Sequence, residues 1–168
     1  MRPLHILAAA LSLSAATLLP ALAGTSDLKG PDGSPRGKVT VSAAPKGVVL
    51  KIEAKGLTPG WHGIHFHEKG DCSAPDAMSA GEHWNPTNKT HGQWGKESFH
   101  LGDIGNLKVG DDGRGSISME TDQWSLVPDA MDSVLGRSIV IHAQPDDFTT
   151  QPAGAAGARI GCGVVQKK

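Results

Sequence analysis

Six of the eight histidines in this sequence stand at spacings that suit metal coordination. His65 and His67 lie two residues apart in an apolar run, and residues two apart in a β-strand point to the same face. Their imidazoles would therefore converge on one point, as metal ligands do. Four more histidines and an acid follow along the chain: His83, His91, His100, Asp103 and His142. Because one ion needs fewer ligands than this, the sequence predicts two ions, and imidazole favours zinc and copper over hard cations.

Other interpretations apply to residues near these ligands. His62 stands at an odd offset from His65, so it points to the opposite face of the strand, and we interpret it as a buried structural histidine. Asp103 could be an ordinary loop acid, but its spacing of three from His100 favours a ligand. Asp147 is interpreted as a solvated residue, and the four tryptophans as packing or interface residues.

Residues 1–23 have the pattern of a signal peptide. Arg2 gives a positive start, residues 6–19 form an apolar run, and Ala21-Leu22-Ala23 matches an A-x-A cleavage site. A membrane anchor is the alternative, but the run is shorter than the roughly 18 apolar residues that a span needs. We therefore predict cleavage before Gly24 and export to an oxidising compartment.

The remaining chain, residues 24–168, is long enough for one domain with a hydrophobic core. Without Arg2 it carries 15 basic and 17 acidic residues, a net charge of −2. This balance argues against binding to nucleic acid or to an anionic membrane surface. Cys72 and Cys162 are the only cysteines, and in an exported protein such a pair predicts one disulfide. Two buried free thiols are the alternative.

Short alternating segments between glycines and prolines predict an all-β fold. We place eight strands near residues 25–30, 36–43, 47–54, 61–67, 103–109, 114–120, 137–143 and 159–165. Strands at this spacing favour an antiparallel sandwich or barrel. Residues 68–102 contain no convincing strand or helix. A loop of that length in a compact domain indicates a function, and here it contains Cys72 and three candidate ligands.

Five segments of the chain resemble the copper/zinc superoxide dismutases. They are residues 56–68 (GLTPGWHGIHFHE), 83–86 (HWNP), 100–106 (HLGDIGN), 136–142 (GRSIVIH) and 158–165 (ARIGCGVV). The resemblance covers nearly all of residues 24–168, in order. Cys72 lies only five residues after His67, and the second loop, residues 144–158, is short and poor in charge. Both features are similar to the bacterial branch of the family.

The resemblance implies a role for each site residue. Copper would be held by His65, His67, His83 and His142, and zinc by His83, His91, His100 and Asp103. His83 would bridge the two ions and take part in catalysis. Arg159 would be the second catalytic residue, beside the open copper position. Asp146 would link His65 to His91.

The implied fold is an eight-stranded antiparallel Greek-key sandwich or barrel of the immunoglobulin-like type, with a long metal-binding loop. The implied activity is disproportionation of superoxide to dioxygen and hydrogen peroxide, as antioxidant defence in the periplasm. The mature form would bind neither nucleic acid nor membrane, and a homodimer is one of the open oligomeric states. A metal buffer without turnover and a structural sandwich with a zinc-clamped loop are the alternatives. Guidance of the anion by a charged second loop is not expected, and Lys89, Lys96 or Arg114 are candidates to replace it.

Overall fold

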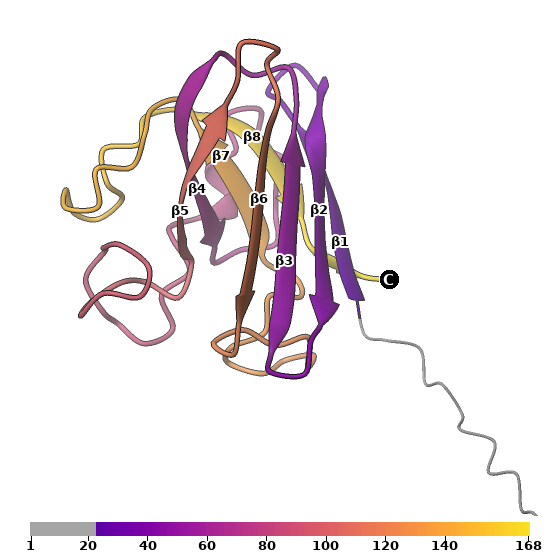
Figure 1. Cartoon of the computed structure of the whole chain (residues 1–168), viewed down its shortest axis with the longest axis vertical. Coiled ribbons are helices and arrows are strands. Elements are labelled where there is room, and N and C mark those ends of the chain that lie inside the picture. Colours follow the sequence, from indigo (N-terminus) through magenta and orange to yellow (C-terminus); the bar gives the residue numbers. More distant parts are fainter. Residues whose placement is uncertain (1–22) are drawn as a thin grey trace, which may run out of the picture.

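Eight antiparallel strands form a closed ring in the computed structural model, which describes residues 23–168 (Figure 1). In chain order they are β1 (Ala23–Lys29), β2 (Pro35–Ala43), β3 (Val48–Ala54), β4 (Gly60–His67), β5 (Asp103–Val109), β6 (Gly115–Thr121), β7 (Ser138–His142) and β8 (Arg159–Val164). Each begins and ends within two residues of its predicted limits, so the all-β prediction is confirmed. A two-residue strand that the sequence pattern does not predict, β9 (Gln166–Lys167), pairs with β1.

The strands follow the order β1-β2-β3-β6-β5-β4-β7-β8 around the ring, and β8 returns to β1. β6 lies beside β3 and β7 beside β4, which are Greek-key connections. Two contacts in the ring, which we call the seams, consist of one residue pair each: Val109 with Gly115 between β5 and β6, and Lys29 with Cys162 between β1 and β8. The seams divide the ring into two four-stranded sheets, so the fold is a flattened barrel, or sandwich.

The space between the two sheets is filled by side chains from alternating positions. β3 shows this alternation clearly, since Val48, Leu50, Ile52 and Ala54 are buried and the residues between them are more exposed. Trp124 is buried in the same core and donates its indole N–H to the carbonyl of Leu101 at 2.8 Å. Burial of this apolar surface supplies the main driving force for folding.

Two long loops extend from the side of the ring formed by β4 and β5, away from β2 and β3 (Figure 1). We call residues 68–102 the metal loop and residues 144–158 the second loop. As predicted, the metal loop is almost free of regular structure, with one 3-10 turn (Met78–Ala80). Three backbone hydrogen bonds of 2.9 Å link Phe66 of β4, Trp84 and Gly102 in a cycle. Both ends of the ligand-bearing part are therefore fixed to the sheet.

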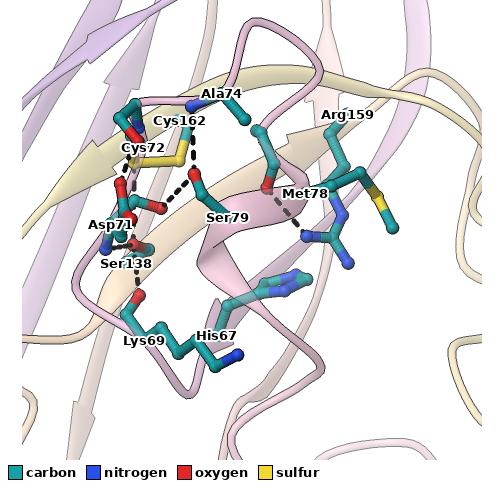
Figure 2. The surroundings of a disulfide bond; sticks show 12 residues. His67, Lys69, Asp71, Cys72, Ala74, Met78, Ser79, Ser138, Arg159 and Cys162 are labelled. Atoms are coloured by element: carbon teal, nitrogen blue, oxygen red, sulfur yellow. Dashed lines mark hydrogen bonds between the residues drawn. A yellow bond between two sulfur atoms is a disulfide. The ribbon is translucent and has the colours of Figure 1, made fainter.

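A disulfide joins the metal loop to the sandwich, as the sequence predicts. Cys72 is bonded to Cys162 of β8 across a separation of 90 residues (Figure 2). In the chain-entropy account, closing a loop of this length stabilises the folded state by about 4 kcal/mol. The bond thus supplies order that the composition of the loop does not.

No helix within residues 23–168 is long and apolar enough to cross a membrane. The predicted signal peptide lies outside the described residues, except for Ala23. That residue begins β1, and its carbonyl accepts a hydrogen bond from the Lys168 amide at 2.9 Å.

Candidate metal centre

The structure brings the six predicted histidines and Asp103 into one buried cluster at the base of the two loops. β4 supplies His65 and His67, β7 supplies His142, and Asp103 is the first residue of β5. His83, His91 and His100 come from the metal loop. Seven buried residues form two groups of four, and within each group the candidate ligand atoms lie within 4.8 Å of one another. The first group is His65, His67, His83 and His142; the second is His83, His91, His100 and Asp103.

The alternation of β4 explains how it serves both the core and the site. Ile64 and Phe66 belong to the hydrophobic core, so His65 and His67 project from the opposite face. His142, the last residue of the neighbouring β7, pairs with Arg159 in β8. Two strands of one sheet therefore carry three ligand candidates, and the next strand carries the predicted arginine.

In the first group, one ring nitrogen of each histidine is used to hold the ring. His67 Nδ1 donates to the Gly81 carbonyl at 2.9 Å, and His142 Nδ1 donates to the Gly157 carbonyl at 3.2 Å. His65 Nε2 lies 2.8 Å from a carboxylate oxygen of Asp146. Such partners fix the ring orientation and leave the other nitrogen available to a metal.

The remaining nitrogens of that group have no hydrogen-bond partner within residues 23–168. They are His65 Nδ1 and the Nε2 atoms of His67, His83 and His142. A buried polar atom without a partner costs about 1–3 kcal/mol. Four such atoms close together are the donor set of a site for a cation that imidazole binds, so the residues fit copper.

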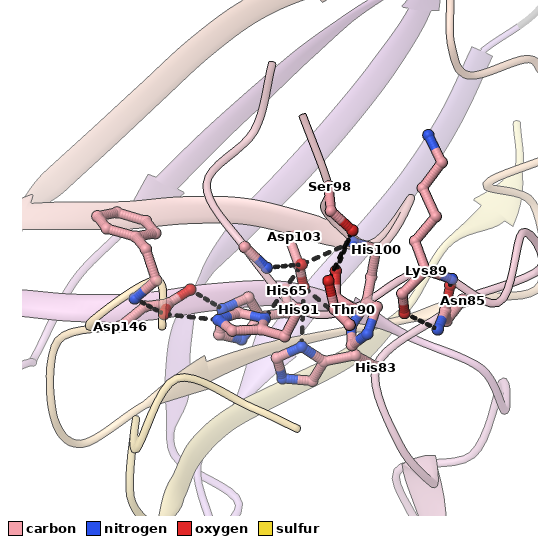
Figure 3. Close-up of polar contacts among 12 residues, drawn as sticks. His65, His83, Asn85, Lys89, Thr90, His91, Ser98, His100, Asp103 and Asp146 are labelled. Atoms are coloured by element: carbon pink, nitrogen blue, oxygen red, sulfur yellow. Dashed lines mark hydrogen bonds and ion pairs between the residues drawn. The ribbon is translucent and has the colours of Figure 1, made fainter. Parts of the chain in front are cut away.

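In the second group, three imidazoles meet one carboxylate (Figure 3). His83 Nδ1 is 2.9 Å and His100 Nδ1 is 3.4 Å from Asp103 Oδ1, and His91 Nδ1 is 3.0 Å from Oδ2. His91 Nδ1 and His100 Nδ1 make no hydrogen bond in the described chain, despite these distances. Three nitrogens and one oxygen are a ligand set that suits four-coordinate zinc.

Asp146 connects the two groups. Its Oδ2 is 2.8 Å from His65 Nε2 and its Oδ1 is 2.9 Å from His91 Nε2, as Figure 3 shows. Asn106 of β5 holds the backbone of Asp146 with two hydrogen bonds, one to its carbonyl at 2.9 Å and one from its amide at 2.7 Å. The carboxylate is therefore placed between the predicted partners by a neighbouring strand.

Burial keeps the metal-facing imidazoles neutral. It lowers the pKa of His67 to about 2 and that of His142 to about 3. Burial also dominates at His83 and lowers its pKa to about 4, although a hydrogen bond with Asp103 opposes the shift. Burial opposes protonation of His91 as well, but the carboxylates of Asp103 and Asp146 beside its two nitrogens outweigh it and raise the pKa to about 9. Metal binding requires unprotonated imidazoles, so the first group is ready to bind at neutral pH.

Two residues of the second loop contact the site although no sequence pattern predicts a role for them. Gln151 holds the backbone of His91, because its Oε1 accepts the His91 amide at 2.9 Å and its Nε2 donates to the His91 carbonyl at 3.0 Å. Gly154 has a positive φ of 64° and packs against Asp146 and His91. No motif marks either residue. Asn106 lies in residues 100–106, one of the five segments that carry the family resemblance, and this is the only sequence feature that points to it.

His62 is buried and belongs to neither group, as predicted. Its ring nitrogens lie 2.8 Å from the carbonyl of His142 and 2.9 Å from that of Thr58. Of the tryptophans, Trp84 and Trp124 are core residues, whereas Trp61 is 53% exposed.

A pocket with a volume of about 800 Å³ opens above the first group. His67, His83, His142 and Arg159 line it, together with Asp76 and mostly uncharged residues of both loops. Arg159 Nη1 donates to the carbonyl of Ala77 at 2.8 Å, which fixes the guanidinium beside Met78 (Figure 2). Lys89, Lys96 and Arg114 do not line this pocket.

Comparisons with known proteins agree with this geometry. The family described as copper/zinc superoxide dismutase (SODC) matches residues 35–165. A Cu-Zn superoxide dismutase of Caulobacter vibrioides is 48% identical over 148 residues, 84% of each chain. A protein of Brugia pahangi named extracellular superoxide dismutase is 37% identical over 143 residues, 80% of this chain and 70% of its own. The crystal structure of a SOD-like protein from Bacillus subtilis has a TM-score of 0.78 and 37% identity, over 86% of this chain and 99% of that one.

Proposed function

Because this chain belongs to the copper/zinc superoxide dismutase family, we propose that it converts two superoxide anions and two protons into dioxygen and hydrogen peroxide. One observation carries the proposal: two buried four-ligand groups share His83, and the first of them lies at the base of an open pocket that contains a guanidinium. A site that only stored metal would need neither the shared ligand nor the cation in the pocket.

His65, His67, His83 and His142 would hold copper through the four nitrogens without a hydrogen-bond partner in the described chain. His83, His91, His100 and Asp103 would hold zinc. When bound, copper supplies a one-electron couple that takes an electron from one superoxide and gives it to another, whereas zinc has no redox chemistry. Asp146 keeps the rings of His65 and His91 in a fixed orientation, as partners of metal ligands do.

His83 can manage a proton as well as hold metal. Its Nδ1 faces Asp103, and its Nε2 faces the first group without a hydrogen-bond partner in residues 23–168. The Nε2 atom can therefore carry a proton in one half of the cycle and donate it to the peroxide product in the other. Solvent supplies the second proton.

Arg159 attracts and orients the substrate. Its guanidinium remains charged under all working conditions and offers donors in a fixed plane. The hydrogen bond to the Ala77 carbonyl and the place of Arg159 opposite His142 hold that charge beside the first group. Superoxide is too small for recognition by shape, so charge is the main means of capture.

The periplasm is the compartment we propose for the mature enzyme, after removal of residues 1–23. The A-x-A site in the sequence, the disulfide and the extracellular description of one relative support export. N-terminal sequencing of protein from the cell envelope tests the cleavage before Gly24. Light scattering decides between a monomer and a homodimer, and a vesicle-binding assay of the mature protein tests the expected lack of membrane binding.

Superoxide turnover after reconstitution tests the proposed activity. Metal-free protein is loaded with copper and zinc, with zinc alone, or with neither, and its rate is compared with that of free copper at the same concentration. We expect rapid turnover only in the protein loaded with both metals. Stoichiometric binding of both metals without turnover would instead identify a metal-storage protein.

A further inference from the structure

The side chains in the wall of the pocket above the first histidine group include two of opposite charge. Among the described residues that line it, the only fully charged side chains are those of Arg159 and Asp76. A pocket that must capture an anion therefore has one cation and one carboxylate in its wall.

Both charges are fixed to the same short turn. The carbonyl of Ala77 accepts the hydrogen bond from Arg159 Nη1, and the next amide, that of Met78, donates to Asp76 Oδ1 at 3.0 Å. Ala77 is buried, and Cys72 ties this part of the loop to β8, which also contains Arg159. Neither charge is therefore free to move away from the other. The Asp76 side chain is exposed and lines the pocket.

We propose that Asp76 determines which anions enter the pocket, by opposing Arg159 more strongly for dianions than for monoanions. The inference rests on the proposed function, in which the substrate is a monoanion. The Coulomb energy between Asp76 and an anion is proportional to the charge of that anion. A repulsion that lowers the occupancy of a monoanion by a given factor lowers that of a dianion by the square of the factor. Asp76 thus lowers superoxide capture moderately and excludes sulfate-like anions far more.

Asp76→Asn isolates this charge. The amide oxygen of the substituted side chain can still accept the Met78 N–H, so the turn keeps its hydrogen bond. Glu82 acts on the charge of Arg159 more strongly than Asp76 does, but it does not line the pocket, and it adjoins the ligand His83, so it is a poorer place for a test. Asp111→Asn is the matched control, because Asp111 is an exposed carboxylate between β5 and β6 that does not line the pocket. Both variants change the net charge of the protein by the same amount.

The test compares anion binding by the three copper- and zinc-loaded proteins. Azide serves as the monoanion and is followed by visible absorption, and sulfate serves as the dianion and is measured by displacement of azide. At low ionic strength we expect Asp76→Asn to tighten azide binding by roughly two- to threefold, and sulfate binding by about the square of that factor. The superoxide rate should rise by about the azide factor, and all the differences should shrink in salt. Asp111→Asn should match the unmodified protein.

Two results would overturn the inference: an Asp76→Asn protein that behaves like Asp111→Asn, or a change for sulfate no larger than that for azide. Metal content is measured in every sample, so a damaged site cannot imitate either result. If the unmodified protein lacks superoxide turnover while the azide and sulfate ratios follow the expected square, the proposed function fails and the role of Asp76 stands.

Discussion

At the scale of single residues, the site depends on how each imidazole divides its two nitrogens. His67 and His142 each donate from Nδ1 to a backbone carbonyl, whereas His65 uses Nε2 for Asp146. The metal-facing atom is therefore Nδ1 in His65 and Nε2 in the other two. His83 differs from all three, because the group that its Nδ1 faces, Asp103, is itself a candidate ligand of the second group.

This difference predicts unequal effects of removing single ligands. His83→Ala should weaken binding of both metals by at least about tenfold, because His83 is the one residue shared by the two groups. His100→Ala should weaken zinc first and leave copper largely in place. Metal analysis after dialysis against a mild chelator measures both. A His83→Ala protein that retains both metals normally would show that this residue does not bridge them.

Arg159 should control the rate without controlling the metals. At limiting superoxide and low salt, Arg159→Ala should lower turnover roughly tenfold, and Arg159→Glu should lower it further, because repulsion replaces attraction. Turnover should fall least in Arg159→Lys, which keeps the positive charge. The salt dependence of the rate should shrink in the Ala variant, since one attracting charge is gone. Stopped-flow rates at two ionic strengths, with metal content as the control, measure these effects. Equal rates in all four proteins would rule out a role in capture.

At the scale of structural elements, the second loop acts as a cover that positions ligands of the metal loop. Gly154 shows how tightly the two loops meet. A Cβ atom added there would overlap Asp146 Oδ1 and lie 2.7 Å from His91 Nε2. Gln151 holds the backbone of the same histidine. The loop thus contributes to the site through contacts that require its backbone conformation rather than through ligands.

Gly154→Ala should therefore damage metal binding, whereas an equal change elsewhere should not. Gly33→Ala is the matched control, because Gly33 has a similar positive φ of 75° and no atom within 4 Å of an added Cβ. Both variants should lose about 1 kcal/mol of stability from backbone strain. Only Gly154→Ala should also lose zinc affinity and turnover, since it displaces His91. Zinc titration of both variants makes the comparison, and equal zinc affinity would disprove the contact.

The sequence predicts the strands and the convergence of His65 and His67 well because both follow local rules. Alternation locates β3, and a spacing of two residues brings His65 and His67 together. The contacts made by Gln151 and Gly154 are different, since they depend on how two loops separated by about forty residues of chain meet. No periodic pattern in the sequence predicts the contacts between these two loops. The sequence does not predict the position of the Asp76 charge either. The disulfide and a turn of the metal loop bring it beside Arg159.

At the scale of the whole molecule, the two sheets have separate tasks. The sheet β5-β4-β7-β8 carries His65, His67, His142, Asp103 and Arg159, and both long loops cover it. The sheet β1-β2-β3-β6 carries none of them and completes the core. Metal binding therefore stabilises one sheet and its loops directly, and the other sheet through packing.

The buried histidines should make the metal-free protein sensitive to acid. In the folded chain the pKa of His67, His142 and His83 is about 2, 3 and 4, compared with 6.5 for an ordinary histidine. Below pH 6.5 the unfolded chain binds more protons than the folded chain. The free energy of unfolding should then fall by about 1.4 kcal/mol per pH unit for each of the three. His91 does not offset this loss, since its raised pKa leaves it protonated in both states there.

Urea unfolding of the metal-free protein at several values between about pH 6 and pH 4.5 measures this slope. We expect a loss of several kcal/mol over that range. In a His142→Gln variant one fewer proton is taken up on unfolding. Its free energy of unfolding should therefore fall less steeply, by about 1.4 kcal/mol per pH unit. A flat stability profile would show that these rings are not buried and neutral in the metal-free protein.

The two seams also bear on how the protein behaves beside other copies of itself. Unpaired backbone groups at the edge of a sheet form a template on which another chain can add a strand. Here each edge strand of one sheet lies against an edge strand of the other, so access to an edge requires a seam to open. The seam between β1 and β8 has one residue pair, and its Cys162 is the cysteine bonded to Cys72. The bond that orders the metal loop therefore also fixes one side of this seam, so we expect chemical reduction to make the seam easier to open.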